Sequence, residues 1–329
     1  MSDKEKALNA SGAGEVTLGD IKNEKKIRRR ELTSRGEERL AYWTLVLPGF
    51  LIYFAVMAFP TIFSFVLSIS NYYRGGQLFG PKAVDFKLVG FGSYAKVFQD
   101  EYFYVALRNN FKIVLISVFG QIPLGFILAY ILNRGLVKFT GFFQTVIYLP
   151  CVISTVVIGI LFKSFFSPTG AWPEVIRLFN PAYQPTVNAN PMASVLLVIL
   201  WMYTGQYLII FMANLQKIDT SIIEAAKIDG ASEFQALRYI ILPALSGTIV
   251  TSAILAISGS LKSFDLIYVM TGGGPANRTT VLSIFMYDKA FKGAPNYALA
   301  NAISTIMVII SFFLIGLTKL AEKKFGGKE

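Results

Sequence analysis

Histidine is absent from this chain of 329 residues, and cysteine occurs once, as Cys151. Histidine is the usual general base and the commonest transition-metal ligand, so imidazole catalysis and a histidine-built metal centre are both excluded. A single cysteine can form neither an internal disulfide nor a zinc cluster. These absences argue against covalent catalysis by this chain.

Charged residues are also scarce. They make up 16% of the chain, whereas 54% of the residues are hydrophobic and the mean hydropathy is +0.53. Soluble domains carry about a quarter charged residues. Here the apolar residues fall in long runs and the charges lie between the runs, which is typical of a chain dissolved in lipid. The composition excludes a disordered protein and predicts an integral membrane protein.

The apolar runs predict six membrane-spanning helices. A helix of about 20 residues crosses a hydrocarbon core of about 30 Å, and a backbone in lipid must satisfy its own hydrogen bonds. Pro60, Pro123 and Pro150 lie inside the first three spans and are expected to be packing kinks rather than gating hinges. The predicted spans are 41–70, 112–132, 142–161, 192–214, 244–261 and 298–320.

Lysine and arginine predict the orientation of these spans. A basic stretch, KNEKKIRRRELTSRGEERL, precedes the first span, and Lys319, Lys323, Lys324 and Lys328 lie at the end of the last one and beyond it. By the positive-inside rule both termini are cytoplasmic, and so are the loops 134–141 and 215–243. Loops 71–111, 162–191 and 262–297 then face outside.

The chain is therefore divided into a cytoplasmic tail at 1–40, a six-helix domain at 41–320 and a cytoplasmic tail at 321–329. No cleavable signal peptide is expected before the first span. The first tail is expected to set topology and to touch anionic lipid, with partner binding as the alternative. These topology signals account for the net charge of +11, which is not interpreted as nucleic-acid binding.

The cytoplasmic loop 215–243 is too patterned for a passive linker: it reads LQKIDTSIIEAAKIDGASEFQALRYIILP. Asp219 or Thr220 is expected to cap a first short helix, and Ser232 a second one. Asp229 and Gly230 favour a turn between the two helices. Pro243 is expected to stop the second helix at the membrane surface. The pattern predicts two small amphipathic helices at a bend.

The segment EAAKIDGASEFQALRYIILP resembles the EAA loop of the membrane subunits of binding-protein-dependent ABC importers. In that family the loop forms a coupling helix that docks in a cleft of the ATP-hydrolysing subunit. Ser246 departs from the family, whose members often have a second proline there. The positions that match the motif, and that the resemblance implies in coupling, are Glu224, Ala225, Ala226, Asp229, Gly230, Ala231, Ile240, Leu242 and Pro243.

A second run, SFDLIYVMTGGGPANRTT, follows the fifth span. Its glycines and proline predict a flexible turn that no helix can cross. The run resembles the FD-x-IY-x-x-T-x-GGP signature of carbohydrate-uptake permeases of the maltose and glycerol-phosphate kind. The resemblance implies an all-α membrane protein with the type I (MetI-like) permease fold, and a contact of the external binding protein with Gly272, Gly273, Gly274 and Pro275.

Polar and small residues inside the spans are candidates for a substrate path. In the fourth span Tyr203, Gln206 and Tyr207, with Trp201 before them, form an aromatic and amide face suited to sugar rings. A small-residue face on the fifth span fits close helix packing equally well. By resemblance to the maltose permease, the positions that contact sugar in that permease correspond here to Met202, Tyr203, Gln206, Ala256, Gly259, Ser260 and Ser263. At most of these positions the residue type differs from that of the maltose permease.

Lys262 and Asp265 lie one helical turn apart near the outer membrane surface and are expected to form an interfacial ion pair, with a contact to the binding protein or to an acidic sugar as the alternative. Arg108, Lys112 and Lys163 are expected to extend toward the outer interface. No metal site and no catalytic residue is predicted.

The resemblance implies a subunit of a sugar or oligosaccharide importer in the bacterial cytoplasmic membrane. Its implied partners are a second, homologous permease subunit, two ATP-binding subunits that hold the ATP and magnesium, an external solute-binding protein, a sugar and membrane lipid. This chain has no phosphate-binding loop of its own. The alternatives are a permease for a glycerol phosphodiester or a polyol, a permease of similar coupling logic for amino acids, peptides or anions, an ion-coupled secondary transporter and a membrane-embedded enzyme. The near absence of carboxylates within the spans argues against the last two.

Overall fold

A computed structural model describes residues 37–72, 86–180 and 191–325 of the chain. The chain divides into two compact units, Met1–Phe63 and Ser64–Glu329, which are described separately. Most of the predicted tail at 1–40, and residues 326–329 of the predicted tail at 321–329, lie outside the described residues. The division into tails and a six-helix domain therefore stays a prediction.

The described chain is helical, as the long apolar runs predicted. Within the described residues, four single helices are long and apolar enough to cross a membrane: Glu37–Ser68, Glu101–Asn133, α10 (Pro191–Leu215) and the segment Tyr297–Leu320 of α17 (Tyr297–Phe325). The first ends in η1 (Phe54–Ala58) and α3 (Phe59–Ser68). The second is built from α5 (Glu101–Ile116), η2 (Ser117–Gln121) and α6 (Ile122–Asn133), and it begins eleven residues before the predicted span 112–132.

The remaining two predicted spans are bent pairs of helices, so six crossings result when each pair is counted once. The prediction of a continuous helix at 142–161 is wrong: α7 (Thr140–Val152) and α8 (Thr155–Phe165) meet at 93°. Ile153 and Ser154 between them have extended ψ angles of 142° and 129°, which no helix can continue through.

The fifth predicted span also begins with a bend. The segment Glu233–Ala244 contains α12 (Glu233–Ala236), η3 (Leu237–Ile241) and α13 (Leu242–Ala244), and it meets α14 (Ser246–Leu261) at 64°. Pro243 was expected to stop the second loop helix, and that helix ends one residue beyond it, at Ala244. The chain stays helical through Pro243 itself because the π-helical turn η3 directly precedes it.

Three prolines share one structural solution, which is a π-helical turn directly before each of them. Proline lacks an N–H and its ring collides with the carbonyl four residues earlier. In each case the preceding amide donates to the carbonyl five residues back, which widens the turn and relieves the collision. The donors Phe59, Ile122 and Leu242 precede Pro60, Pro123 and Pro243, and the acceptors are the carbonyls of Phe54, Ser117 and Leu237.

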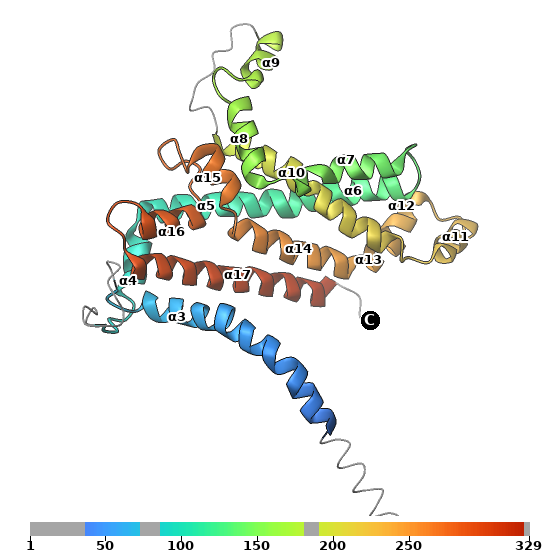
Figure 1. The fold of residues 1–329 in the computed structure, drawn as a ribbon. Coiled ribbons are helices and arrows are strands. Elements are labelled where there is room, and N and C mark those ends of the chain that lie inside the picture. The colour runs from blue at the N-terminus through green and yellow to red at the C-terminus, as the bar shows by residue number, and fades with distance from the viewer. Residues whose placement is uncertain (1–36, 73–85, 181–190, 326–329) are drawn as a thin grey trace, which may run out of the picture. The chain divides into compact units, whose positions relative to one another are not determined.

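Helix α10 lies at the centre of the second unit and packs against α6 and α7 (Figure 1). Two glycines permit the close approach. A Cβ at Gly205 would lie 2.3 Å from the carbonyl oxygen of Ile147 on α7, and one at Gly125 on α6 would lie 2.6 Å from Cβ of Tyr207. Phe211 and Leu208 on the same helix are fully buried and anchor the cluster between α6, α10 and the start of α14.

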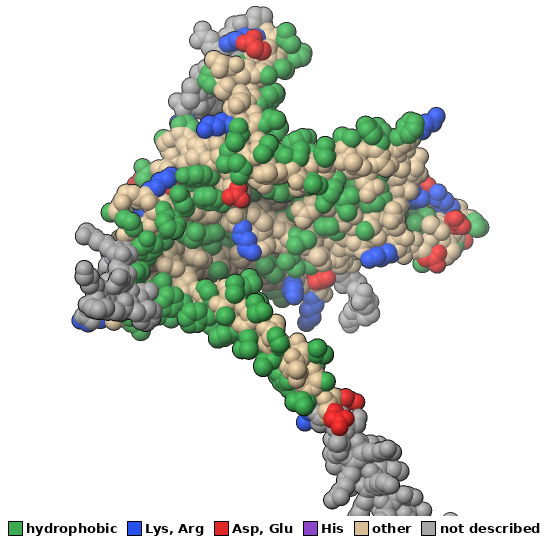
Figure 2. Space-filling view, viewed as in Figure 1, with side chains coloured by type: hydrophobic (Ala, Val, Ile, Leu, Met, Phe, Trp, Pro, Cys, Tyr) green, Lys and Arg blue, Asp and Glu red, His purple; other side chains and the backbone are tan. Residues whose placement is uncertain are grey.

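Short helices gather at the two ends of this bundle. At one end lie α4 (Gly92–Gln99), α15 (Asp265–Thr271) and α16 (Leu282–Phe291); α9 (Ala171–Phe179) follows α8 (Figure 1). At the other end lie α11 (Thr220–Ile228) and α12, together with the C-terminal end of α17. Figure 2 shows hydrophobic side chains spread along the long helices, whereas acidic and basic side chains gather over α11 and α12.

Candidate functional site

The loop between the fourth and fifth spans folds as two capped helices, as predicted. The Oδ1 atom of Asp219 accepts a hydrogen bond from the amide of Ser221, 2.9 Å away, and so caps α11. The Ser232 hydroxyl accepts from the amide of Gln235, and the Gln235 side chain accepts from the amide of Ser232 at 2.7 Å. This reciprocal capping box starts α12. Gly230 lies between the helices with φ +86°.

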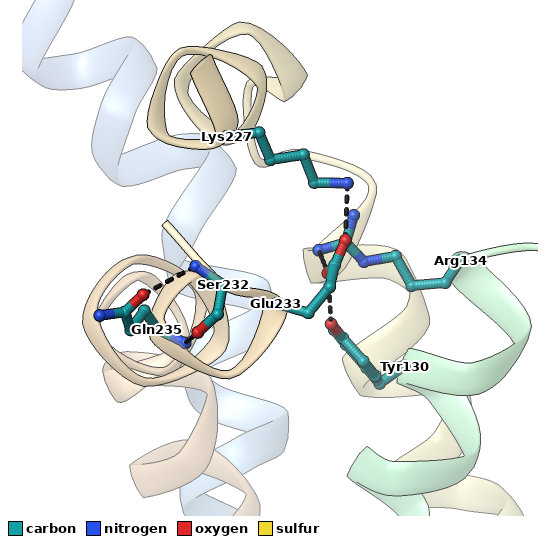
Figure 3. A network of polar contacts seen from close by, with 6 residues as sticks. All are labelled: Tyr130, Arg134, Lys227, Ser232, Glu233 and Gln235. Atoms are coloured by element: carbon teal, nitrogen blue, oxygen red, sulfur yellow. Dashed lines mark hydrogen bonds and ion pairs between the residues drawn. The ribbon is translucent and has the colours of Figure 1, made fainter. Parts of the chain in front are cut away.

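Glu233 connects both loop helices to the end of the second span (Figure 3). Its carboxylate forms an ion pair with Lys227 of α11 at 2.6 Å and with Arg134, at the end of α6, at 2.9 Å. Arg134 also lies 5.3 Å from the centroid of the Tyr130 ring. The hydrogen bond from Lys227 is the main cause that lowers the pKa of Glu233. Charge, caps and a positive-φ turn thus hold the loop in one shape against α6.

The residues that match the EAA pattern differ in their exposure. Glu224, Ala225, Asp229, Gly230 and Pro243 are exposed, whereas Ala226, Ala231, Ile240 and Leu242 are half-buried. Two large apolar side chains that the sequence analysis did not select project beside them: Ile228 is 86% exposed and Phe234 is 71% exposed. Apolar side chains this exposed on a rigid, charged loop are typical of a surface that a partner covers.

The cap of α11 gives a prediction about pH. The backbone hydrogen bond from Ser221 lowers the pKa of Asp219 from its usual value of 3.8. The capped, ionised form therefore stabilises α11 fully above pH 3.8, and the stabilisation is lost as the pH falls toward the lowered pKa. Hydrogen–deuterium exchange should show α11 amides losing protection in acid. In Asp219→Asn, which caps without titrating, this acid-dependent loss should vanish; an unchanged loss would contradict the assignment.

The glycine-rich turn after α15 is fastened rather than flexible, contrary to the prediction. Helix α15 ends at Gly272 with φ +59°, and Gly273 follows with φ +86°. The Thr279 hydroxyl donates to the carbonyl of Gly274 at 2.9 Å, and the Thr280 hydroxyl donates to the carbonyl of Gly273 at 3.1 Å. A Cβ at Gly273 would lie 2.7 Å from the Thr280 hydroxyl oxygen, so the turn needs glycine for its shape.

Two buried asparagines that the sequence analysis missed attach this region to α5. The Nδ2 atom of Asn109 donates to the carbonyls of Arg278 and Thr280, at 2.8 and 2.9 Å. Asn110 accepts from the amide of Leu282 at 2.7 Å and donates to the carbonyl of Ser260 at 3.0 Å. Both side chains are 1% exposed. Two adjacent asparagines in a predominantly apolar helix were the available signal for buried amide contacts.

A cavity of about 200 Å³ lies among α5, η2, α10 and α14. The structure brings five of the seven predicted substrate-path residues to its wall: Tyr203, Ala256, Gly259, Ser260 and Ser263. Met202 instead belongs to the hydrophobic core and is 1% exposed, and Gln206 is exposed and is not among the lining residues. The lining of the cavity includes three aromatic residues, Tyr203, Tyr207 and Phe264, together with small hydroxyl-bearing residues and apolar side chains.

Other residues of the cavity wall come from segments that the sequence analysis left aside. Gln121 is 2% exposed and donates to the carbonyl of Ile199 at 2.7 Å. Ser117 accepts a hydrogen bond from Ser260 at 3.2 Å. Both come from η2, whose polarity inside an apolar run was the signal. Lys262 and Asp265 also line the cavity, and the described structure shows no ion pair between them, contrary to expectation.

The sequence matches the family of binding-protein-dependent transport system inner membrane components over residues 121–326. This chain belongs to that family and is a multi-pass membrane permease subunit. It is 33% identical over 288 residues to the lactose transport system permease protein LacF of Rhizobium radiobacter, with 84% of this chain and 94% of the relative covered. It is 31% identical to the multiple sugar-binding transport system permease protein MsmF of Streptococcus mutans, with 87% and 95% covered.

A solved structure shares the fold. It is a bacterial ABC transporter involved in the import of the acidic polysaccharide alginate; one of its chains superposes with a TM-score of 0.74 at 21% identity and covers 90% of this chain and 100% of its own length. At this identity the likeness supports the fold alone. It agrees with the type I permease fold that the resemblance of the second run implied.

Proposed function

We propose that this chain is one of two permease subunits of an ABC importer that brings a sugar or oligosaccharide into the cell. The relatives LacF and MsmF carry names that refer to lactose and multiple-sugar transport. The observation that carries the proposal for this chain is the cavity, in which the Tyr203 ring and the Ser260 and Ser263 hydroxyls face one space. Aromatic faces and hydroxyl groups are the contacts that sugar rings use.

The proposal assigns coupling to the loop of α11 and α12. Two ATP-binding subunits, which hold the ATP and magnesium, engage its exposed side, and this chain itself hydrolyses nothing. Closure of the ATPase pair moves the loop as a rigid body. Because Glu233 ties the loop to Arg134 and α10 leads directly into the loop, that motion reaches the helices that line the cavity. An external binding protein delivers substrate to the opposite end, near Gly272–Pro275.

The same assignment places α11, α12 and both termini in the cytoplasm, with the membrane as the chain's surroundings. The C-terminal end of α17 lies at the end of the bundle that carries α11 and α12, which fits this orientation. The clustered lysines of the C-terminal segment support it by the positive-inside rule.

Gly259→Leu tests the cavity. A Cβ at Gly259 meets no atom within 4 Å, and Gly259 lines the cavity, so a leucine there fills the space without distorting α14. We expect sugar uptake to be lost while the partner subunits still assemble. Gly247→Leu is the matched control, because Gly247 lies on the same helix with equally open surroundings and is not among the lining residues. Equal uptake by the two variants would refute the cavity as the path.

A further inference from the structure

A second cavity, of about 350 Å³, lies toward the outer end of the bundle and is lined by three basic side chains. Arg108 and Lys112 come from α5, and Arg278 comes from the segment after the glycine-rich turn. Val105, Pro191 and Met192 complete much of the wall. We call this space the basic pocket.

The three cations converge because the backbone around them is held. Arg108 and Lys112 are four residues apart and so share one face of α5. Asn109, between them, donates to the carbonyl of Arg278 at 2.8 Å and fixes the segment that carries the third cation. The Lys112 ammonium also donates to the Asn109 Oδ1 at 3.4 Å. One buried amide thus keeps charges from two distant parts of the chain around one space.

These charges have no acidic counterpart at the pocket. None of its lining residues is Asp or Glu, and none of the three cations forms an ion pair with a carboxylate in the described parts of the chain. The sequence of 181–190, directly before Pro191, contains no acidic residue. Arg108 and Arg278 are exposed and Lys112 is half-buried. Three like charges around one hollow, partly screened by water, favour the binding of an anion there. Cations that only extend toward lipid headgroups would not need to converge from separate segments.

The basic pocket and the substrate cavity follow each other along the same two helices. On the helix formed by α5 and η2, Arg108 and Lys112 line the basic pocket, and Ile113, Ser117 and Gln121 line the cavity. Arg108 and Ser117 are therefore separated by about 13 Å along the helix axis. On α10 the basic pocket takes Met192 and the cavity begins at Ile199. A solute that travels inward along these helices passes the basic pocket first.

We propose that the basic pocket is an oxyanion-binding site that receives the carboxylate or phosphate group of an acidic sugar on its way to the cavity. This deepens the proposed function and rests on it. The guanidinium groups of Arg108 and Arg278 supply planar pairs of donors that match such oxyanions, and the Lys112 ammonium adds a third charge. The imported sugar therefore carries an acidic group. A phospholipid headgroup offers the same chemistry, and the test separates the two sources.

The test compares galacturonate with galactose, and glucose 6-phosphate with glucose, on the purified full-length chain in a neutral detergent. We expect the acidic member of at least one pair to raise the melting temperature, with an affinity that falls steeply as salt is added. In R108Q/K112Q/R278Q this affinity should drop by at least about tenfold, as expected for the loss of charge-assisted hydrogen bonds. Lys163→Gln, which removes an exposed cation outside the pocket, should leave it unchanged.

Three results would overturn the proposal. In the first, acidic sugars fail to bind. In the second, they bind the triple variant as well as they bind the unaltered chain. In the third, acidic sugars have no effect, whereas phosphatidylglycerol stabilises the unaltered chain but not the triple variant. The last result would assign the pocket to lipid. The proposed function is tested separately by ATP-driven uptake. If the chain imported neutral sugars but bound no acidic sugar, the importer assignment would stand and the oxyanion-site proposal would be refuted.

Discussion

Gly230→Pro is expected to abolish ATP-driven uptake while the chain still reaches the membrane. Gly230 has φ +86°, whereas proline fixes φ near −65°, so the turn between α11 and α12 cannot keep its shape. The substitution also removes the amide that donates to the carbonyl of Lys227 at 3.1 Å. The loop of α11 and α12, to which we assign coupling, then loses the geometry that Glu233 and the two caps maintain. Uptake in proteoliposomes, normalised to the amount of chain inserted, measures the effect.

Gly293→Pro is the control for backbone strain. Gly293 has φ +68° and equally open surroundings, but it lies between α16 and α17, at the other end of the bundle. We expect this variant to retain uptake. Glu224→Lys is the companion variant that leaves the turn intact, because it changes only an exposed side chain. It should lose the ATP-binding subunits on purification. Normal uptake by both Gly230→Pro and Glu224→Lys at normal expression would remove the coupling assignment.

Gly205→Ala is expected to cause a large loss of stability, although it adds only a single methyl group. Its Cβ would lie 2.3 Å from the carbonyl oxygen of Ile147 and 2.7 Å from Cα of Tyr148, and both atoms belong to the α7 backbone. Backbone atoms cannot relieve the contact by a rotamer change as a side chain can, so α7 and α10 must separate. Overpacking of this kind costs about 1–3 kcal/mol. A melting curve in detergent should therefore shift downward by roughly 2–10 °C.

Gly247→Ala supplies the comparison. Gly247 is also helical, and a Cβ there meets no atom within 4 Å. Since alanine favours a helix over glycine by about 1 kcal/mol, this variant should melt at the same temperature as the unaltered chain or slightly higher. If Gly205→Ala and Gly247→Ala had the same melting temperature, the close packing of α7 on α10 would be wrong.

The apolar runs predicted the helical fold and the approximate place of every span, because burial in lipid constrains composition more strongly than burial in a soluble core. The interruptions could not be read in the same way. Pro150 and Pro123 look alike in sequence. One lies near a 93° break between α7 and α8, and the other follows a π-helical turn within a span that stays in one piece. Pro150 is buried and Pro123 is exposed, and the sequence alone does not indicate this difference.

The loop of α11 and α12 was predictable because its signals are local. Asp219, Ser232 and Gly230 act on residues within three positions of themselves, and each has the role that the sequence indicated. The cavity wall and the turn after α15 were less predictable. Asn110 joins Ser260 and Leu282 across separations of 150 and 172 residues. A polar residue in an apolar helix indicates a buried polar contact, but it does not identify the distant partner. The same holds for the two cavity residues from η2.

Reconstitution of this chain, with the subunits that co-purify with it, in proteoliposomes that enclose ATP would test the importer assignment directly. We expect an ATPase and a second permease to accompany the chain, and sugar uptake to require ATP together with an external binding protein. A chain that purifies alone and drives uptake without ATP would refute the importer assignment and would indicate a secondary transporter.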